Sequence, residues 1–455
     1  MLGAKVAAAR GVGALARAAG RGGGTSLPGK VLIRLDRHAI GALAARLPGG
    51  SAVISATNGK TTSAAMAAAG LRAGGRRLVH NHAGANMAGG VASTLVEAAR
   101  GRGIDGELGL FEVDEAWLGP LCSQLRPRAL LLGNLFRDQL DRYGELDAIA
   151  DRWAEVVASR PGGSALVLNA DDPLVADLGR GREGTLYFGV EDDSMALEQI
   201  QHAADSTHCR ACGSPYRYEA VYLGHLGRYA CPGCGNARPR PAVAAERVDL
   251  HGVRSASVAL RTPEGPLELE LPLPGLYNVY NALGALALCI ALGVPARVAA
   301  SGIASVSAAF GRAETLSLDG RELSILLIKN PAGANEVLRT LALEPGPLDL
   351  LAVLNDRIAD GRDVSWIWDA DFELLAGRVR RVTCGGTRAA ELALRLRYAG
   401  LEGEALRVVP EPARALDTAL GDGSGTLYAL PTYTALLELR DLLADRGHAP
   451  RYWAA

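Results

Sequence analysis

A glycine, a lysine and several hydroxyl residues stand together in the segment 51–62, which reads SAVISATNGKTT. Its apolar, β-branched start predicts a strand, and the alanine-rich run 64–71 predicts a helix, so Gly-Lys-Thr falls on the loop between them. A loop at a helix N-terminus points N–H groups and the positive end of the helix dipole at an anion. Gly59 permits close approach, Lys60 can reach the β- and γ-phosphates, and Thr61 can hold Mg²⁺. The pattern predicts an ATP site formed by Thr57, Asn58, Gly59, Lys60, Thr61 and Thr62.

Acidic and amide residues follow three further predicted strands. They lie in the segments 111–115 (FEVDE), 134–144 (NLFRDQLDRYG) and 168–173 (LNADDP). The carboxyl ends of parallel strands form the edge where α/β proteins bind ligands, so one acid of the first segment is a candidate Mg²⁺ ligand. We favour Glu112 over Glu115 because it is closer to the strand end. Two structural alternatives remain. The segment 54–61 could be an ordinary turn, because the full phosphate-loop motif requires glycine at position 54, where the chain has isoleucine. The acidic segments could be charged loops with aspartate caps.

Four of the seven cysteines stand as two C-x2-C pairs separated by 18 residues. This spacing predicts a tetrahedral zinc site, and because all four positions are cysteine the zinc would be structural, with no position left for a catalytic water. The pairs lie in an insertion at about 205–240, whose arginines are scattered, so we favour a scaffold or partner surface over nucleic-acid binding. The expected zinc ligands are Cys209, Cys212, Cys231 and Cys234.

The rest of the chain supplies the elements that would position these residues. Its 455 residues are 49% hydrophobic with a net charge of −1, which predicts two or three domains and gives no general attraction to nucleic acid or anionic lipid. The sequence contains no apolar run of about 18 residues, so it predicts no membrane-spanning helix. The alanine-rich start lacks a signal-peptide pattern. Apolar β-rich runs alternate with helical ones, which predicts parallel α/β sheets. We expect an N-terminal helical segment at 1–48, a central ATP-binding domain at 49–312 and a C-terminal α/β domain at 313–455.

Read in order, T-N-G-K-T-T, N-x-x-R-D-x-x-D-x-x-G and N-A-D-D-P resemble the Mur ligase superfamily. The resemblance implies a central ATP-binding domain, a C-terminal α/β domain, and activation of a carboxylate as an acyl phosphate that an amine attacks. It also implies that Asn278 and Asn281 lie near the adenine and that Arg312 is the hinge between domains. Two features depart from the peptide-building branch. Gln139 stands where that branch has a metal-binding histidine, and about 48 residues are too few for its UDP-sugar domain.

Further segments narrow the resemblance. K-N-P-A-G-A-N at 329–335, the polar segment 354–369, H-N-H-A-G-A-N-M at 80–87 and the four-cysteine insertion are together similar to the MurT family, the synthetase subunits of lipid II isoglutaminyl synthases. This implies amidation of the α-carboxyl of D-glutamate in the lipid II stem peptide, at the inner face of the plasma membrane. The resemblance also implies that ammonia comes from a glutaminase partner, GatD, in a heterodimer. No cysteine of this chain stands in a glutaminase setting, which favours an ammonia supplier in trans or free ammonia.

In that family resemblance, Asp363 matches an aspartate that orients the catalytic histidine of the partner. From the sequence alone it could equally cap a helix beginning near Val364, and the two roles are compatible. Two other functions stay open: a Mur-type ligase that adds glutamate to folate, and a zinc-ribbon NTPase acting on nucleic acid. The insertion argues against the first, and the absence of a basic stripe argues against the second.

Overall fold

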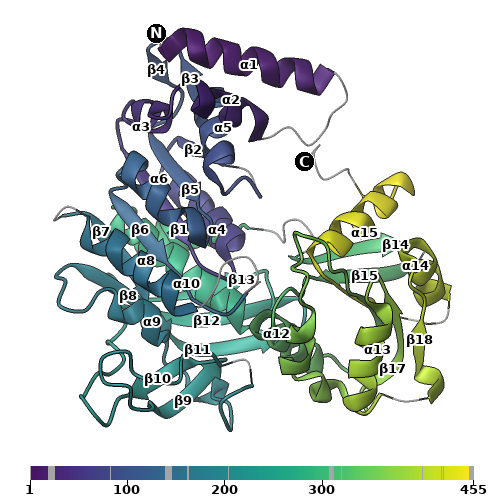
Figure 1. The fold of residues 1–455 in the computed structure, drawn as a ribbon. Helices are drawn as coiled ribbons and strands as arrows, with labels where there is room; N and C mark the ends of the chain where they lie inside the picture. The colour runs from purple at the N-terminus through teal and green to yellow at the C-terminus, as the bar shows by residue number, and fades with distance from the viewer. Residues whose placement is uncertain are drawn as a thin grey trace.

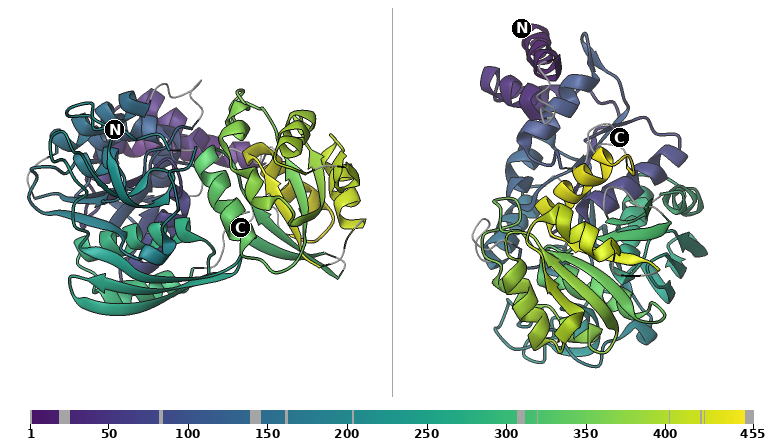
Figure 2. Two further views of the ribbon diagram at one scale, coloured as in Figure 1. Left: turned by 90° about the horizontal axis from the view of Figure 1, so that it is seen from below. Right: turned by 90° about the vertical axis from the view of Figure 1, so that its right-hand side faces the viewer.

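The computed structural model describes residues 2–18, 26–81, 84–138, 146–160, 163–202, 204–306, 312–318, 320–401, 403–421, 423 and 425–449. Within them the chain forms a nine-stranded sheet, a six-stranded sheet and two small two-stranded sheets. Figures 1 and 2 show the two large sheets in separate lobes, each covered by helices. The α/β architecture predicted from the sequence is therefore confirmed. The domain boundaries stay a prediction.

The nine-stranded sheet has the order β13-β12-β11-β8-β7-β6-β1-β5-β2. From β2 to β11 every pair is parallel, as predicted, but β12 and β13 are antiparallel additions that were not anticipated. The connections from β11 to β12 and from β12 to β13 are only a few residues long, and such short connections can join only antiparallel strands. The strands are β1 (Ser51–Ser55), β2 (Leu78–His80), β5 (Leu108–Glu112), β6 (Ala129–Leu132), β7 (Ala165–Asn169), β8 (Thr185–Val190), β11 (Val243–His251), β12 (Ser255–Thr262) and β13 (Gly265–Leu271).

Helices cover both faces of this sheet, because successive side chains of its buried strands point to opposite sides. In β1, Ala52 and Ile54 belong to one hydrophobic core while Val53 belongs to the other. The first core is covered by α4 (Lys60–Ala73), α10 (Leu276–Ala291) and α11 (Ala296–Ala304). The second core is covered by α1 (Leu2–Ala18), α2 (Leu27–Leu35), α3 (Ala39–Ala44), α5 (Ala88–Ala98), α6 (Leu118–Leu125), α8 (Leu146–Ala158) and α9 (Pro173–Asp177).

Small elements complete the first lobe. In the sequence, a hairpin of β9 (Arg217–Leu223) and β10 (Leu226–Ala230) follows β8 and precedes β11. It lies at the bottom of the molecule in Figure 1. The hairpin is part of the insertion, with one cysteine pair before β9 and the other after β10. The other small elements are β3 (Ala99–Arg100), β4 (Gly103–Ile104), and the 3₁₀ turns η2 (Glu115–Trp117) and η3 (Asp193–Met195).

The six-stranded sheet has the order β14-β15-β19-β16-β17-β18 and is parallel except for the β14–β15 pair. Its faces bury two further cores. The strands are β14 (Arg312–Leu318), β15 (Arg321–Leu326), β16 (Leu348–Val353), β17 (Val379–Gly385), β18 (Leu406–Val408) and β19 (Leu427–Pro431). The helices are α12 (Pro331–Ala342), α13 (Ala389–Tyr398), α14 (Pro412–Gly421), α15 (Tyr433–Asp445), and the 3₁₀ turns η4 (Ser365–Asp369), η5 (Phe372–Leu375) and η6 (Gly403–Ala405).

None of the helices in the described part of the chain combines the length and the apolar character that crossing a bilayer requires.

Candidate active site

The predicted phosphate loop joins the end of β1 to the start of α4. Gly59 is the N-cap of α4 and has a φ of 81°, in the left-handed region that glycine adopts without strain. A Cβ atom at this position would also overlap the Oδ1 atom of Asn281 on α10. The same oxygen accepts a hydrogen bond of 3.1 Å from Ser63. Position 59 therefore needs glycine twice over, for its backbone angle and for close packing against α10.

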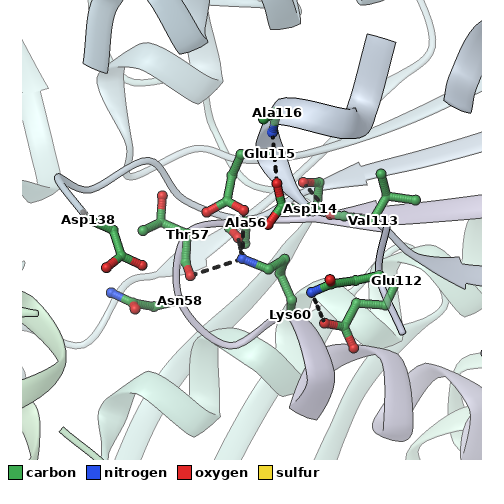
Figure 3. Close-up of polar contacts among 12 residues, drawn as sticks. Ala56, Thr57, Asn58, Lys60, Glu112, Val113, Asp114, Glu115, Ala116 and Asp138 are labelled. Carbon is green, nitrogen blue, oxygen red and sulfur yellow. Dashed lines mark hydrogen bonds and ion pairs between the residues drawn. The ribbon is translucent and has the colours of Figure 1, made fainter. Parts of the chain in front are cut away.

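Lys60 begins α4 and lies in a cage of oxygen atoms. Its Nζ donates to the backbone oxygens of Ala56 (2.6 Å) and Thr57 (3.2 Å) and pairs with Glu115 at 2.8 Å (Figure 3). The Lys60 and Glu115 side chains are only 11% and 5% exposed. Burial lowers the pKa of Lys60, but the neighbouring carboxylates, Glu115 first and then Asp114 and Glu112, together outweigh burial, and the pKa lies above its ordinary value. The lysine therefore carries its charge at the loop.

Glu112 and Glu115 lie on different sides of Lys60 (Figure 3). Glu112 is the last residue of β5, and its Oε1 accepts a hydrogen bond of 3.1 Å from Asn86. Glu115 lies in the following 3₁₀ turn, which Asp114 caps by accepting from the Ala116 N–H. Burial raises the pKa of Glu115, while Lys60 and Lys329 oppose that rise. The structure thus brings both candidate acids to the loop, and Glu112 as the Mg²⁺ ligand stays a prediction. Thr61 and Thr62 are half-buried in the first turn of α4.

The second polar segment braces the loop through paired hydrogen bonds. Asn134 accepts from the Asn58 N–H at 2.8 Å and donates to the Asn58 carbonyl at 3.0 Å. The Phe136 N–H donates to the Thr57 hydroxyl oxygen at 3.1 Å. Gln139, which replaces the metal-binding histidine of the peptide-building branch, lies outside the described residues.

The aspartates of N-A-D-D-P hold elements together. Asp172 caps α9 and also accepts from the Leu135 N–H at 2.8 Å. Asp171 is fully buried and accepts from Arg238 and from the Tyr280 hydroxyl, both at 2.6 Å. Their contacts match the aspartate-cap alternative for this segment. They join β7 to the insertion and to α10.

The two asparagines expected near the adenine lie at the start of α10 behind the loop. Asn278 donates to the Pro274 carbonyl at 2.8 Å and accepts from Asn281 at 3.1 Å. Asn281, but not Asn278, lines a small cavity together with Asn58 and Asn134. Arg312, the expected hinge residue, opens β14, and its side chain lies outside the described part.

Residues of the second lobe reach the phosphate loop, which the sequence did not predict. The Lys329 Nζ donates to the Thr57 carbonyl at 3.1 Å and pairs with Asp138. Asn330 donates to the Asn58 side chain at 2.9 Å and caps α12 by accepting from the Gly333 N–H. The available signal was local: asparagine followed by proline is typical of an N-cap and first turn, which places both residues at a helix start.

Asp363 lies in a different setting from the loop residues. It is exposed, and its Oδ1 accepts from the Ser365 N–H at 2.8 Å, just before η4. These hydrogen bonds from Ser365 hold the pKa of Asp363 below its ordinary value. The helix expected near Val364 is therefore a 3₁₀ turn that begins at Ser365, with Asp363 bonded to its first N–H. Nearby, buried Asp360 accepts from the Thr434 N–H at 2.7 Å and anchors the segment to α15.

The four insertion cysteines meet with their sulfur atoms within 4.8 Å of one another. Closest pairs are 3.3 and 3.6 Å apart, near the spacing of about 3.8 Å in a tetrahedral zinc–thiolate site. Both knuckles have the same turn, because Gly213 and Gly235 have φ values of 76° and 75° and donate to the carbonyls of Cys209 and Cys231. None of the seven cysteines, all of which the structure describes, forms a disulfide. The residues fit a structural zinc ion.

The fold and loop define the class first. Residues 54–231 match the model of the Mur ligase middle domain, and residues 327–436 match that of the MurT ligase C-terminal domain. A pseudomurein peptide ligase type C from Methanothermus fervidus has the same fold, with a TM-score of 0.68 and 22% identity over 89% of this chain and 80% of that one. The MurF ligase of Thermotoga maritima, solved in complex with ADP, gives a TM-score of 0.62 at 14% identity, covering 91% and 85%. This is a Mur-type ligase fold.

The family follows from a curated relative. The chain is 34% identical over 432 residues to the lipid II isoglutaminyl synthase (glutamine-hydrolyzing) subunit MurT of Streptococcus pneumoniae, and the match covers 93% of each chain. The chain therefore belongs to the MurT family of the Mur ligases. It is an enzyme of the ATP-dependent ligase type.

Proposed function

We propose that this ligase uses ATP to convert the α-carboxyl of D-glutamate in the lipid II stem peptide to an amide, giving D-isoglutamine. One observation carries the proposal: a charged Lys60, whose side chain is only 11% exposed, stands between two buried glutamates at a phosphate loop, in a chain of the MurT family. A folate ligase or a nucleic-acid NTPase has no comparable support in the family match.

The chemistry follows from the carboxylate, which is a poor electrophile until phosphorylation supplies a leaving group. Transfer of the γ-phosphate gives an acyl phosphate, ammonia attacks the acyl carbon, and phosphate leaves. Lys60 would neutralise charge on the transferred phosphate, which replaces Glu115 as its anionic partner. Lys329 of the other lobe donates to the same Thr57 carbonyl as Lys60 and would add a second positive charge.

The remaining cofactor assignments rest on donor chemistry. Thr61 and Glu112 offer the oxygen ligands that Mg²⁺ prefers, and the metal would neutralise phosphate charge when bound. Asn278 and Asn281 would bind the adenine through their amides, and Arg312 would act at the hinge. The four cysteines would hold a structural zinc ion, since all four ligand positions are protein thiolates. A neighbour of the same fold was solved with ADP, which supports ATP as the nucleotide.

Ammonia would come from a glutaminase partner of the GatD type in a heterodimer. The relative is named as a subunit and as glutamine-hydrolyzing, which supports such a partner. Asp363 is exposed and lies just before η4. An acid that completes the Cys–His pair of a partner must be accessible in this way. The lipid-linked substrate places the reaction at the inner face of the plasma membrane.

The test is direct. The chain, the glutaminase, glutamine, Mg·ATP and lipid II are mixed, and the lipid product is analysed by mass spectrometry. We expect the mass change of an acid converted to an amide, and the same change when ammonium chloride replaces glutamine and glutaminase. No change with lipid II, alongside turnover of a folate or a UDP-linked peptide, would contradict the proposal.

A further inference from the structure

Arg137 is the point where three parts of the chain meet. Its backbone N–H donates to Asp205 at 2.9 Å, and its Nε lies 3.1 Å from the same carboxylate. Its Nη2 donates to the carbonyl of His202 at 3.0 Å and pairs with Asp369 at 3.3 Å. One side chain thus joins the strand-end segment after β6, the start of the zinc insertion, and the second lobe.

On one side, this residue is tied to the phosphate loop. Its neighbour Phe136 donates its N–H to Thr57 of the loop, and Leu135 donates to buried Asp172. The backbone leading to Arg137 is therefore held by the loop and by α9.

On the other side, Arg137 holds the segment that carries Asp363. Asp369 is the last residue of η4, which starts two residues after Asp363. Asp371 repeats the connection, because it lies 3.2 Å from the His202 ring and is bonded to Asn335 on α12 in both directions. The segment 363–371 is thus attached to the first lobe by residues 137 and 202.

We propose that Arg137 is a positioning residue that fixes the segment 363–371 relative to the phosphate loop, so that ammonia is delivered close to the acyl phosphate. The inference rests on the proposed function. In the partner, glutamine and water give glutamate and ammonia. At the loop, the ammonia nitrogen forms the new C–N bond while the acyl C–O bond breaks and phosphate leaves with the electron pair. If the two sites shift apart, ammonia escapes to solvent before it reacts.

The readout is the number of glutamine molecules hydrolysed per amide formed, measured on the complex of the full chain with the glutaminase. The test variant is Asp369→Asn, which keeps the shape of the side chain and removes its charge. We expect that number to rise about fivefold, the scale of losing one partly exposed ion pair, while ammonium-driven amidation stays within about twofold. Arg137→Met should raise it at least as much, because it also loses the contacts with Asp205 and His202. Adding Asp369→Asn to Arg137→Met should change the number little, because the ion pair between residues 137 and 369 is already broken.

A matched control is Glu373→Gln in the neighbouring turn, which loses an ion pair with Arg395 inside the second lobe. It should leave the ratio unchanged. An equal fall of glutamine- and ammonium-driven amidation in Asp369→Asn, or an unchanged ratio, would overturn the proposal.

Hydrogen exchange separates this inference from the proposed function, because it needs neither partner nor substrate. In the isolated chain, Asp369→Asn should speed exchange of the amides of residues 135–137, and Glu373→Gln should not. Suppose that the wild-type chain and the glutaminase together make no amide from glutamine, but exchange in Asp369→Asn rises as expected. The proposed function would then be wrong, and the role of Arg137 in connecting the two lobes would be right. Unchanged exchange in Asp369→Asn would overturn the role of Arg137 in holding the segment 363–371.

Discussion

The phosphate loop and the segment from Asp360 to Asp371 are built in opposite ways. At the loop, Lys60 and its carboxylate partner Glu115 are buried and satisfied by this chain. In the segment, Asp363 is exposed, and Trp368 exposes 48% of its surface. Exposed acid and aromatic groups suit a protein partner, whereas the ion pair at the loop is enclosed by this chain. Under the proposed function, phosphate chemistry would be contained in this chain and ammonia supply would be shared with the partner.

Lys60→Met gives the largest expected effect, because it removes the loop's buried positive charge. We expect amidation to fall by about 10³-fold with either glutamine or ammonium as the nitrogen source, since both use the same acyl phosphate. Initial rates of amide formation from lipid II measure it.

Lys30→Met, an exposed lysine on α2, is the matched control and should change neither rate. A Lys60 variant that lost only glutamine-driven activity would break the division between the two regions.

Asp363→Asn should act on one nitrogen source only. We expect glutamine-driven amidation to fall by about 10²-fold, because the partner's histidine would lose its orienting carboxylate, while ammonium-driven amidation is retained. Rates with the two nitrogen sources, taken on the same preparation, measure the difference.

Asp417→Asn on α14 is an exposed control that removes a carboxylate far from η4 in the sequence, together with its ion pair to Arg446. If Asp363→Asn lowered both activities equally, the aspartate would act through the fold of η4 and not through a partner.

Zinc removal tests the insertion, which packs against the segment that braces the phosphate loop. The hairpin turn of the insertion buries His225, whose ring packs against Phe136 of the loop brace at 4.6 Å between centroids. Cys209→Ser should lose the expected content of about one zinc ion per chain and lower Tm by about 5 °C or more, since a structural metal contributes to folding. Cys122→Ala should keep the zinc. Metal analysis and thermal unfolding measure both, and a zinc-free wild type would contradict the site.

Local patterns predicted the parts of the site that neighbouring residues build. The strand, loop and helix around Gly59, and the paired knuckles, follow from segments of a few residues. The alternation in 255–271, visible as L-E-L-E-L near its end, is also a local signal for the antiparallel strands β12 and β13.

What the sequence could not predict depends on distant residues. Lys329 meets the carbonyl of Thr57 across 272 positions, and no spacing rule connects them. The choice between Glu112 and Glu115 as the partner of Lys60 depends on the 3₁₀ turn after β5, which brings Glu115 back over the loop. Proximity to the strand end favoured Glu112 as a metal ligand, and it gave no information on the lysine's partner.

Asn330 offers the smallest and sharpest test, because its side chain does two separable things. Its Oδ1 caps α12, and its Nδ2 donates to Asn58 of the loop at 2.9 Å. Asn330→Ser keeps a capping oxygen and loses the contact with the loop, so stability should be retained while the KM for ATP rises about threefold. Asn330→Ala loses both, and the free energy of unfolding should fall by about a further 1 kcal/mol. Denaturant unfolding and ATP titrations measure the pair. Equal KM values for the serine variant and the wild type would show that Asn330 only caps its own helix and contributes nothing to ATP binding, which would leave the contact of Lys329 with Thr57 to connect the second lobe to the loop.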